Sequence, residues 1–154
     1  MMRLLTQKFC YIGLLIGLCN LSAPASASGS PAEKAALGTL DQFMVAFNAR
    51  DMQAWADTIH FPHIRIASGQ VSIFESAEAF QARKVFDSLK KIGWSRSQWI
   101  DRTITLSSPD KVHIETIFER LDADGASIGR YQSLYIVTQQ NGRWGIQARS
   151  SLAP

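Results

Sequence analysis

The chain has 154 residues, of which 46% are hydrophobic, with 16 basic and 13 acidic side chains and a net charge of +3. This length suits one domain that buries its own core. Without residues 1–27 the chain keeps 14 basic and 13 acidic residues. This balance excludes the strongly basic classes of nucleic-acid-binding and membrane-binding domains.

Residues 1–27 have the features of a secretory signal peptide. Arg3 and Lys8 make a basic start, an apolar run covers residues 11–18, and Ala25-Ser26-Ala27 is a small-residue cleavage pattern. The apolar run is shorter than the about 20 residues that a membrane-spanning helix needs. The pattern therefore indicates a cleaved signal rather than an anchor.

We predict cleavage before Ser28, export to the periplasm or secretion, and one mature domain over residues 28–154. A retained N-terminal anchor and a lipid attached at Cys19 are the alternatives. Both cysteines, Cys10 and Cys19, lie in the predicted signal peptide, so the mature domain is expected to contain no disulfide and no cysteine-ligated metal.

A helical hairpin is predicted at the start of the mature domain. Ser30 is followed by a proline and an early glutamate, which is the pattern of a capped helix start. Apolar residues then recur on one helical stripe: Leu37, Leu40, Phe43, Met44 and Phe47. Asp51 can cap a second, short helix that contains Met52, Trp55 and Ile59.

A pair of short strands follows the hairpin. Pro62 is expected to end the second helix, because proline lacks the backbone N–H that a helix interior uses. The residues after Pro62 read as a strand that turns at Gly69 into a second strand, Gln70 to Phe74.

Ser76 opens a third helix that we expect to continue to about Lys91, with Gly93 ending it. Its basic side chains are expected to face solvent: Arg83, Lys84, Lys90 and Lys91. Trp94 to Leu106 then reads as a long strand.

The rest of the chain predicts an antiparallel meander. From Asp110 to Leu121 apolar and polar residues alternate, with Val112, Ile114, Thr116 and Phe118 on one face. The dipeptides Asp124-Gly125 and Asn141-Gly142 are hairpin turns, because their residues accept positive φ. They introduce two further strands, Ile128 to Thr138 and Arg143 to Ser150.

Three local segments carry a family resemblance. They are Phe47-Asn48-Ala49-Arg50-Asp51 at the helical turn, Asp122-Ala123-Asp124-Gly125 at the first meander turn, and Asn141-Gly142-Arg143-Trp144 before the last strand. Their order and spacing, over nearly the whole mature chain, resemble the NTF2-like superfamily, which includes SnoaL-like cyclases and ketosteroid isomerases.

The resemblance implies an α+β, cystatin-like cone. A curved antiparallel sheet would pack on the N-terminal helical hairpin and the third helix, and leave a pocket at the open end. It also implies a homodimer through the exposed face of the sheet. We expect arginines on that face to pair with Glu115 and Glu119 across strands: Arg102, Arg120, Arg130 and Arg149.

Isomerase chemistry is disfavoured by two positions. A ketosteroid isomerase needs a carboxylate base and a donor to the enolate oxygen. The resemblance places Phe43 at the position of the donor tyrosine and Ala67 at that of the general-base aspartate. Neither side chain can transfer a proton.

The first strand carries the most suggestive polar side chains. By alternation His63, Arg65 and Ala67 share one face, which looks into the cone in the register of the resemblance. An imidazole and a guanidinium on one wall favour an anionic ligand. The alternative places Ile64 and Ile66 in the core and turns the two polar side chains to solvent.

We therefore expect a small organic ligand, with anions favoured, bound by His63 and Arg65 with further contacts from Trp55, Tyr131 and Trp144. Two other functions stay open: an enzyme that uses His63 as a general base, and a protein-interaction module whose cone is filled by side chains.

No metal or other cofactor is expected. His60 and His63 lie on either side of Pro62, which prevents one helical turn from presenting both imidazoles, and a zinc site would need His113 or Glu115 as a third ligand. No membrane or nucleic-acid partner is expected for the mature domain.

Overall fold

The structure is a computed structural model that describes residues 29–153. The predicted signal peptide, with Cys10 and Cys19, lies outside the described residues. The helices of the described part are α1 (Pro31–Ala49), α2 (Met52–Asp57), α3 (Ala77–Gln81) and α4 (Val85–Lys91). The strands are β1 (Ile59–Ala67), β2 (Gln70–Phe74), β3 (Arg96–Ser107), β4 (Lys111–Leu121), β5 (Ser127–Gln140) and β6 (Arg143–Ser151).

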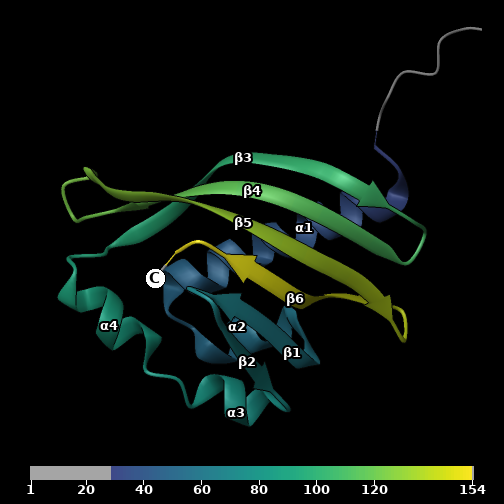
Figure 1. Ribbon diagram of the computed structural model, residues 1–154, viewed down its shortest axis with the longest axis horizontal. Helices are drawn as coiled ribbons and strands as arrows, with labels where there is room; N and C mark the ends of the chain where they lie inside the picture. The colour runs from purple at the N-terminus through teal and green to yellow at the C-terminus, as the bar shows by residue number, and fades with distance from the viewer. Residues whose placement is uncertain (1–28, 154) are drawn as a thin grey trace, which may run out of the picture.

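The strands form a six-stranded sheet in the order β2-β1-β6-β5-β4-β3. Figure 1 shows that the long strands β3, β4 and β5 curve and that α1 lies across one face of the sheet. The predicted α+β class and curved sheet are confirmed. The sheet is antiparallel except between β1 and β6, which pair in parallel.

The helical hairpin forms for local reasons. The Ser30 hydroxyl accepts a hydrogen bond from the Glu33 N–H at 3.2 Å, and the Glu33 carboxylate accepts one from the Ser30 N–H at 2.8 Å. This capping box satisfies two N–H groups that the first turn leaves without helical partners. The Asp51 carboxylate accepts from the Ala54 N–H at 2.9 Å and caps α2. Both predicted caps are confirmed.

Two boundaries differ from the prediction. Ile59 begins β1 instead of ending the second helix, and Pro62 lies within that strand. The third helix is two short helices, α3 and α4, with a break at residues 82–84. At the break the Arg83 Nε donates to the Phe80 carbonyl at 2.8 Å, and its guanidinium lies over the Phe80 ring. The expectation of one continuous helix is therefore wrong. Arg83 folds inward, contrary to the prediction, whereas Lys84, Lys90 and Lys91 are exposed as predicted.

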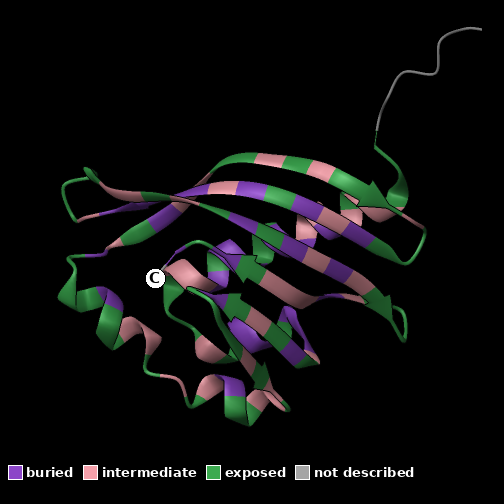
Figure 2. Cartoon of the chain, viewed as in Figure 1, coloured by how far each residue is buried: buried purple, intermediate pink, exposed green. Residues whose placement is uncertain are grey.

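The core lies between α1, α2 and one face of the sheet. Buried residues alternate with more exposed ones along β5 and along residues 111–118 of β4 in Figure 2, as the period of two predicts, and residues 118–121 are all buried. Val112, Ile114 and Thr116 are fully buried, and Tyr135 of β5 is buried beside them. Asn141 and Gly142 both have positive φ, as the hairpin prediction requires.

A bulge in β6 changes which residues face the interior. Ile136 pairs with Ala148 and Val137 pairs with Ile146, so Gln147 is an extra residue in β6. An extra residue reverses the alternation beyond it. As a result Ile146 and Arg149, three positions apart, both face the interior.

None of the helices in residues 29–153 has the length and apolar character that a membrane crossing requires.

Candidate functional site

A cavity of about 480 Å³ lies between the helices and the sheet. Most of the side chains that line it from the helices are apolar: Phe43 and Phe47 of α1, Trp55 of α2, Phe80 of α3, and Val85 and Leu89 of α4. From the sheet and the C-terminal end come Ile146 and Ala153. Figure 1 shows this end of the chain between α4 and the sheet. The volume suits a small organic molecule.

The charged side chains that line the cavity from the described part of the chain are all basic. It consists of Arg65 of β1, Arg83 and Lys84 between α3 and α4, Arg120 of β4 and Arg149 of β6. Within residues 29–153 no aspartate or glutamate lines this cavity. Confined cations without carboxylates repel one another, and an anion would neutralise them.

Arg149 is at the centre of this cluster, and its position is set by hydroxyl groups. Its Nη2 donates to Ser133 Oγ at 3.1 Å and to Ser151 Oγ at 3.2 Å, and these two hydroxyls are themselves 2.9 Å apart. The guanidinium carbon lies 4.9 Å from the centre of the Tyr135 ring. The buried Arg149 Nε has no hydrogen-bond partner in the described chain.

Arg83 is held in a similar way from the helical side. Besides the bond from Nε to the Phe80 carbonyl, its guanidinium lies 3.6 Å from the Phe80 ring centre and 4.6 Å from that of Trp55. Burial, followed by the positive charges of Arg65 and Arg149, lowers the pKa of Arg83 to about 10. Its Nη2 is buried and without a partner in residues 29–153.

Arg65 and Arg120 complete the cluster from the sheet. Arg65 pairs in register with Arg149 on β6, so the two side chains are neighbours. Arg120 is 8% exposed, with its guanidinium 4.8 Å from the centre of the Tyr131 ring. Burial lowers the pKa of both Arg65 and Arg120, and the charge of Arg149 lowers both further.

Four buried nitrogen atoms on lining residues lack partners within the described chain: Trp55 Nε1, Arg83 Nη2, Arg120 Nε and Arg149 Nε. All four are donors, and buried donors are normally satisfied. A hydrogen-bond acceptor bound in the cavity could pair with these donors. Trp55 and Arg120 are each more than nine-tenths buried, so bulk water reaches them poorly.

His63 adds one acceptor to this set of donors. Its Nδ1 lies 3.2 Å from the Ile146 carbonyl oxygen, a contact that requires a proton on Nδ1 and leaves Nε2 unprotonated in the neutral ring. The pKa of His63 is lowered to about 4, first by burial and then by the charges of Arg83 and Arg149, while hydrogen bonds with the backbone act in the opposite direction. The imidazole is therefore neutral at pH 7.

Three of the five predicted ligand contacts line the cavity: His63, Arg65 and Trp55. Ile64 and Ile66, which alternate with His63 and Arg65, are 36% and 43% exposed. The inward face of β1 is therefore the one that carries the polar side chains, and the alternative with the two isoleucines in the core is wrong.

Tyr131 and Trp144 lie outside the lining. Tyr131 packs on Phe118 in a second apolar cluster, with ring centres 5.5 Å apart. Trp144 lies at the hairpin end of β6, opposite Gln139, while Arg149 lies near the other end of the strand. The aromatic character of these two residues alone did not indicate that they lie away from the cavity.

Sequence reasoning missed Arg83, Arg120 and Arg149, which it placed on solvated faces. The inward position of Arg120 could have been predicted, because it lies two residues after Phe118 on β4 and so shares the inward face of that strand. The inward position of Arg149 could not have been predicted from alternation, because the bulge at Gln147 reverses which face Arg149 occupies. Of the other arginines, Arg130 does pair with Glu119, at 3.1 Å.

Arg102 instead pairs with Asp41 of α1, at 2.6 Å, so its partner lies on a helix and not across the sheet. The Phe43 ring lines the cavity, and Ala67 is buried. Neither provides a proton-transferring group.

No group of three or more His, Cys, Asp or Glu side chains within residues 29–153 is arranged to hold a metal ion. His60 Nδ1 lies 3.0 Å from Thr138 Oγ1, and the ring packs against Gly145.

The architecture and cavity define a cone-shaped α+β domain with a basic pocket. The family model described as "NTF2-like protein (DUF6841)" matches residues 33–153. The chain belongs to this NTF2-like family, as its sequence resemblance predicted. No functionally curated protein matches the chain.

Solved structures with the same fold include a cystatin-like domain of unknown function from Nostoc punctiforme PCC 73102. It has a TM-score of 0.67 and 14% identity, with 82% of this chain and 80% of that chain covered. A ketosteroid isomerase-like protein from Erwinia carotovora atroseptica has a TM-score of 0.60 and 16% identity, with coverage of 82% and 100%. An NTF2-like protein of unknown function from Shewanella oneidensis MR-1 has a TM-score of 0.64 and 13% identity, with coverage of 79% and 98%. At these identities the likeness concerns the fold alone.

Proposed function

We propose that this domain binds a small anionic organic molecule in the cavity between the helices and the sheet. The observation that carries the proposal is the composition of the lining, with five basic side chains and, among residues 29–153, no carboxylate. His63, Arg65 and Trp55 are retained as ligand contacts, and Arg83, Arg120 and Arg149 are added.

The energetic cost of this arrangement supports a binding role. Removing a cation from water costs several kcal/mol unless a counter-charge and hydrogen bonds compensate. Arg83 and Arg149 are each fixed by one nitrogen and keep another nitrogen without a partner in the described chain. Donors held in place in this way lose little entropy when an acceptor arrives.

The two other functions are less well supported. A cone packed with side chains would suit an interaction module, but the cavity measures about 480 Å³. An enzyme would need a base, and a pKa of about 4 makes His63 a weak one at neutral pH. Phe43, on the opposite wall, offers no acid or oxyanion donor.

The proposal is tested on the mature protein. Native mass spectrometry should detect a co-purified anion, and removal of that anion by dialysis under denaturing conditions followed by refolding should lower the melting temperature. Adding it back should restore the melting temperature in the wild type and in Arg130→Gln, but not in Arg149→Gln. Equal restoration in all three proteins would contradict the proposal.

We also propose that the domain is exported after cleavage before Ser28. The basic start, short apolar run and Ala25-Ser26-Ala27 support it. Mass spectrometry of the protein from the extracytoplasmic fraction should give the mass of residues 28–154. An intact Met1 or a lipid on Cys19 would contradict the proposal.

A homodimer through the outer face of the sheet is proposed as well. Ile64 and Ile66 of β1 pair with Ile73 and Val71 of β2, and these four apolar side chains are exposed on one face. Ile66→Lys should convert a dimer to a monomer in sedimentation experiments, whereas Leu106→Lys, on the edge strand β3, should not. A wild-type monomer at micromolar concentration would exclude this interface.

A further inference from the structure

The cavity has two chemically different walls. Within residues 29–153, the lining residues that belong to the sheet are one apolar residue, Ile146, and four polar ones, His63, Arg65, Arg120 and Arg149. Of the lining residues in this range that belong to the helices, only Ser88 is polar. Arg83 and Lys84 lie in the break between α3 and α4 and add two basic side chains to the lining from the helical side.

The apolar wall is mainly aromatic, and its rings contact one another. Phe43 and Trp55 meet edge to face with centres 5.5 Å apart, and Phe47 and Trp55 do so at 5.0 Å. Phe80 meets Trp55 at 4.9 Å. Such a surface favours a flat aromatic partner, because offset and edge-to-face ring pairs add stabilisation beyond apolar burial.

A compact ion alone would not fill a cavity of about 480 Å³. An inorganic phosphate or a small polycarboxylate would leave the aromatic wall in contact with water. An apolar body would cover that wall and displace the water.

We infer that the ligand is an aromatic carboxylic acid whose carboxylate lies against Arg65, Arg120 and Arg149 and whose ring lies on Phe43, Phe47 and Trp55. This inference rests on the proposed function and adds the class and the orientation of the ligand. Guanidinium groups match a planar carboxylate through two parallel N–H···O bonds. The Nε atoms of Arg120 and Arg149, which have no partner among residues 29–153, are donors for this pairing.

The ligand class is tested by calorimetry with four probes: 2-naphthoate, its neutral analogue 2-naphthamide, citrate and inorganic phosphate. We expect 2-naphthoate to bind at least tenfold more tightly than each of the others. Tighter binding of citrate that is lost in Arg149→Gln would overturn the aromatic acid and leave the proposed function standing, whereas tighter binding of inorganic phosphate would overturn both. Absence of binding by all three anions, or equal binding of naphthoate and naphthamide, would overturn both.

The orientation is tested by one variant on the basic wall and two variants on the apolar wall. Arg149→Gln should remove the preference for naphthoate over naphthamide. Val85→Thr, which keeps the shape of the side chain, and Phe47→Leu should each weaken naphthoate about two- to tenfold while leaving phosphate binding unchanged. Circular dichroism verifies that each variant is folded. Equal loss of naphthoate and phosphate in a folded apolar-wall variant would overturn the orientation.

Discussion

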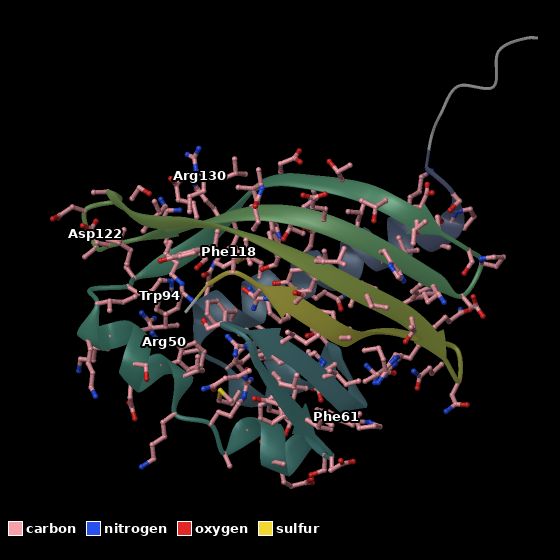
Figure 3. The ribbon with its side chains drawn as sticks, viewed as in Figure 1. Arg50, Phe61, Trp94, Phe118, Asp122 and Arg130 are labelled. Carbon is pink, nitrogen blue, oxygen red and sulfur yellow. The ribbon has the colours of Figure 1, made fainter. Side chains whose placement is uncertain are left out.

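Arg120 and Arg130 lie on adjacent strands of the same sheet, yet their surroundings are opposite. Arg130 is mostly exposed and lies 3.1 Å from the Glu119 carboxylate, and Figure 3 shows its side chain pointing away from the body of the protein. Arg120, one position after Glu119, is buried, and its Nε has no partner in the described residues. Arg130 therefore has a carboxylate partner within the chain, whereas Arg120 has none among the described residues.

This difference indicates what each face contributes. The pair of an exposed Arg130 and a largely buried Glu119 is open to solvent on one side, and pairs near the surface stabilise a fold by about 0–1 kcal/mol. Buried cations without counter-charges destabilise it, because they lose hydration and repel one another. We therefore attribute the arginines that line the cavity to ligand binding, and Arg130 to its pair with Glu119. The following experiments test this difference between the two kinds of arginine.

The largest effect is expected on binding. Arg149→Gln should weaken binding of the native anion about 30- to 5,000-fold, because removing one partner of a buried, hydrogen-bonded charge pair costs about 2–5 kcal/mol. Arg130→Gln is the matched control on the outer face and should change affinity less than twofold. Calorimetry measures both, and comparable losses would end the distinction between the two faces.

The next effect is a dependence of stability on pH. The pKa of His63 is lowered from 6.5 to about 4 in the folded protein, so between these values the unfolded chain binds the proton more readily. Stability therefore falls as the pH drops from about 6.5 to 4, by about 3 kcal/mol for this group. Burial, and then Arg143, lower the pKa of His60 as well, which acts in the same direction.

Urea unfolding at pH 4 and at pH 7 measures this dependence. His63→Gln should reduce the difference in unfolding free energy between the two pH values by about 3 kcal/mol, because glutamine has no proton to gain in this range. A variant with the wild-type difference would show that His63 is not desolvated, and that the inner wall is wetter than its burial indicates.

The stability of the unliganded protein should respond in opposite ways on the two faces. Arg120→Met replaces a buried cation by an apolar side chain of similar length and should raise the free energy of unfolding by about 1–2 kcal/mol. Arg130→Met should change it by about 0.5 kcal/mol or less. Urea denaturation of the anion-free protein gives both values. A destabilised Arg120→Met would mean that Arg120 supports the fold.

The smallest effect is expected where an arginine already has its carboxylate. Asp41→Asn removes the charge opposite Arg102, in a pair with a distance of 2.6 Å and a largely exposed aspartate. The loss of stability should be about 0.5 kcal/mol, and ligand affinity should not change. A change in ligand affinity of more than threefold would indicate that the binding site includes the edge of the sheet near β3.

Much of the fold could be predicted because its signals are short. The capping box at Ser30 and the Asn141-Gly142 turn each depend on two to four residues. The alternation along β4 extends over one strand and identified its inward face. The inward orientation of His63 and Arg65 followed from the same alternation once the family resemblance had given the register.

The rest of the site was decided by contacts between distant segments. The extra residue Gln147 in β6 exists only relative to β5, and it turns Arg149 inward. Arg83 leaves a helical pattern because Phe80 and Trp55 offer it a carbonyl and two rings. The sequence by itself determined the elements and the order in which they occur, since caps, turns and periodicity act over a few residues. Only the tertiary structure decided that five basic side chains surround one cavity, because the face that a side chain occupies after a bulge or a helix break depends on the segment packed against it.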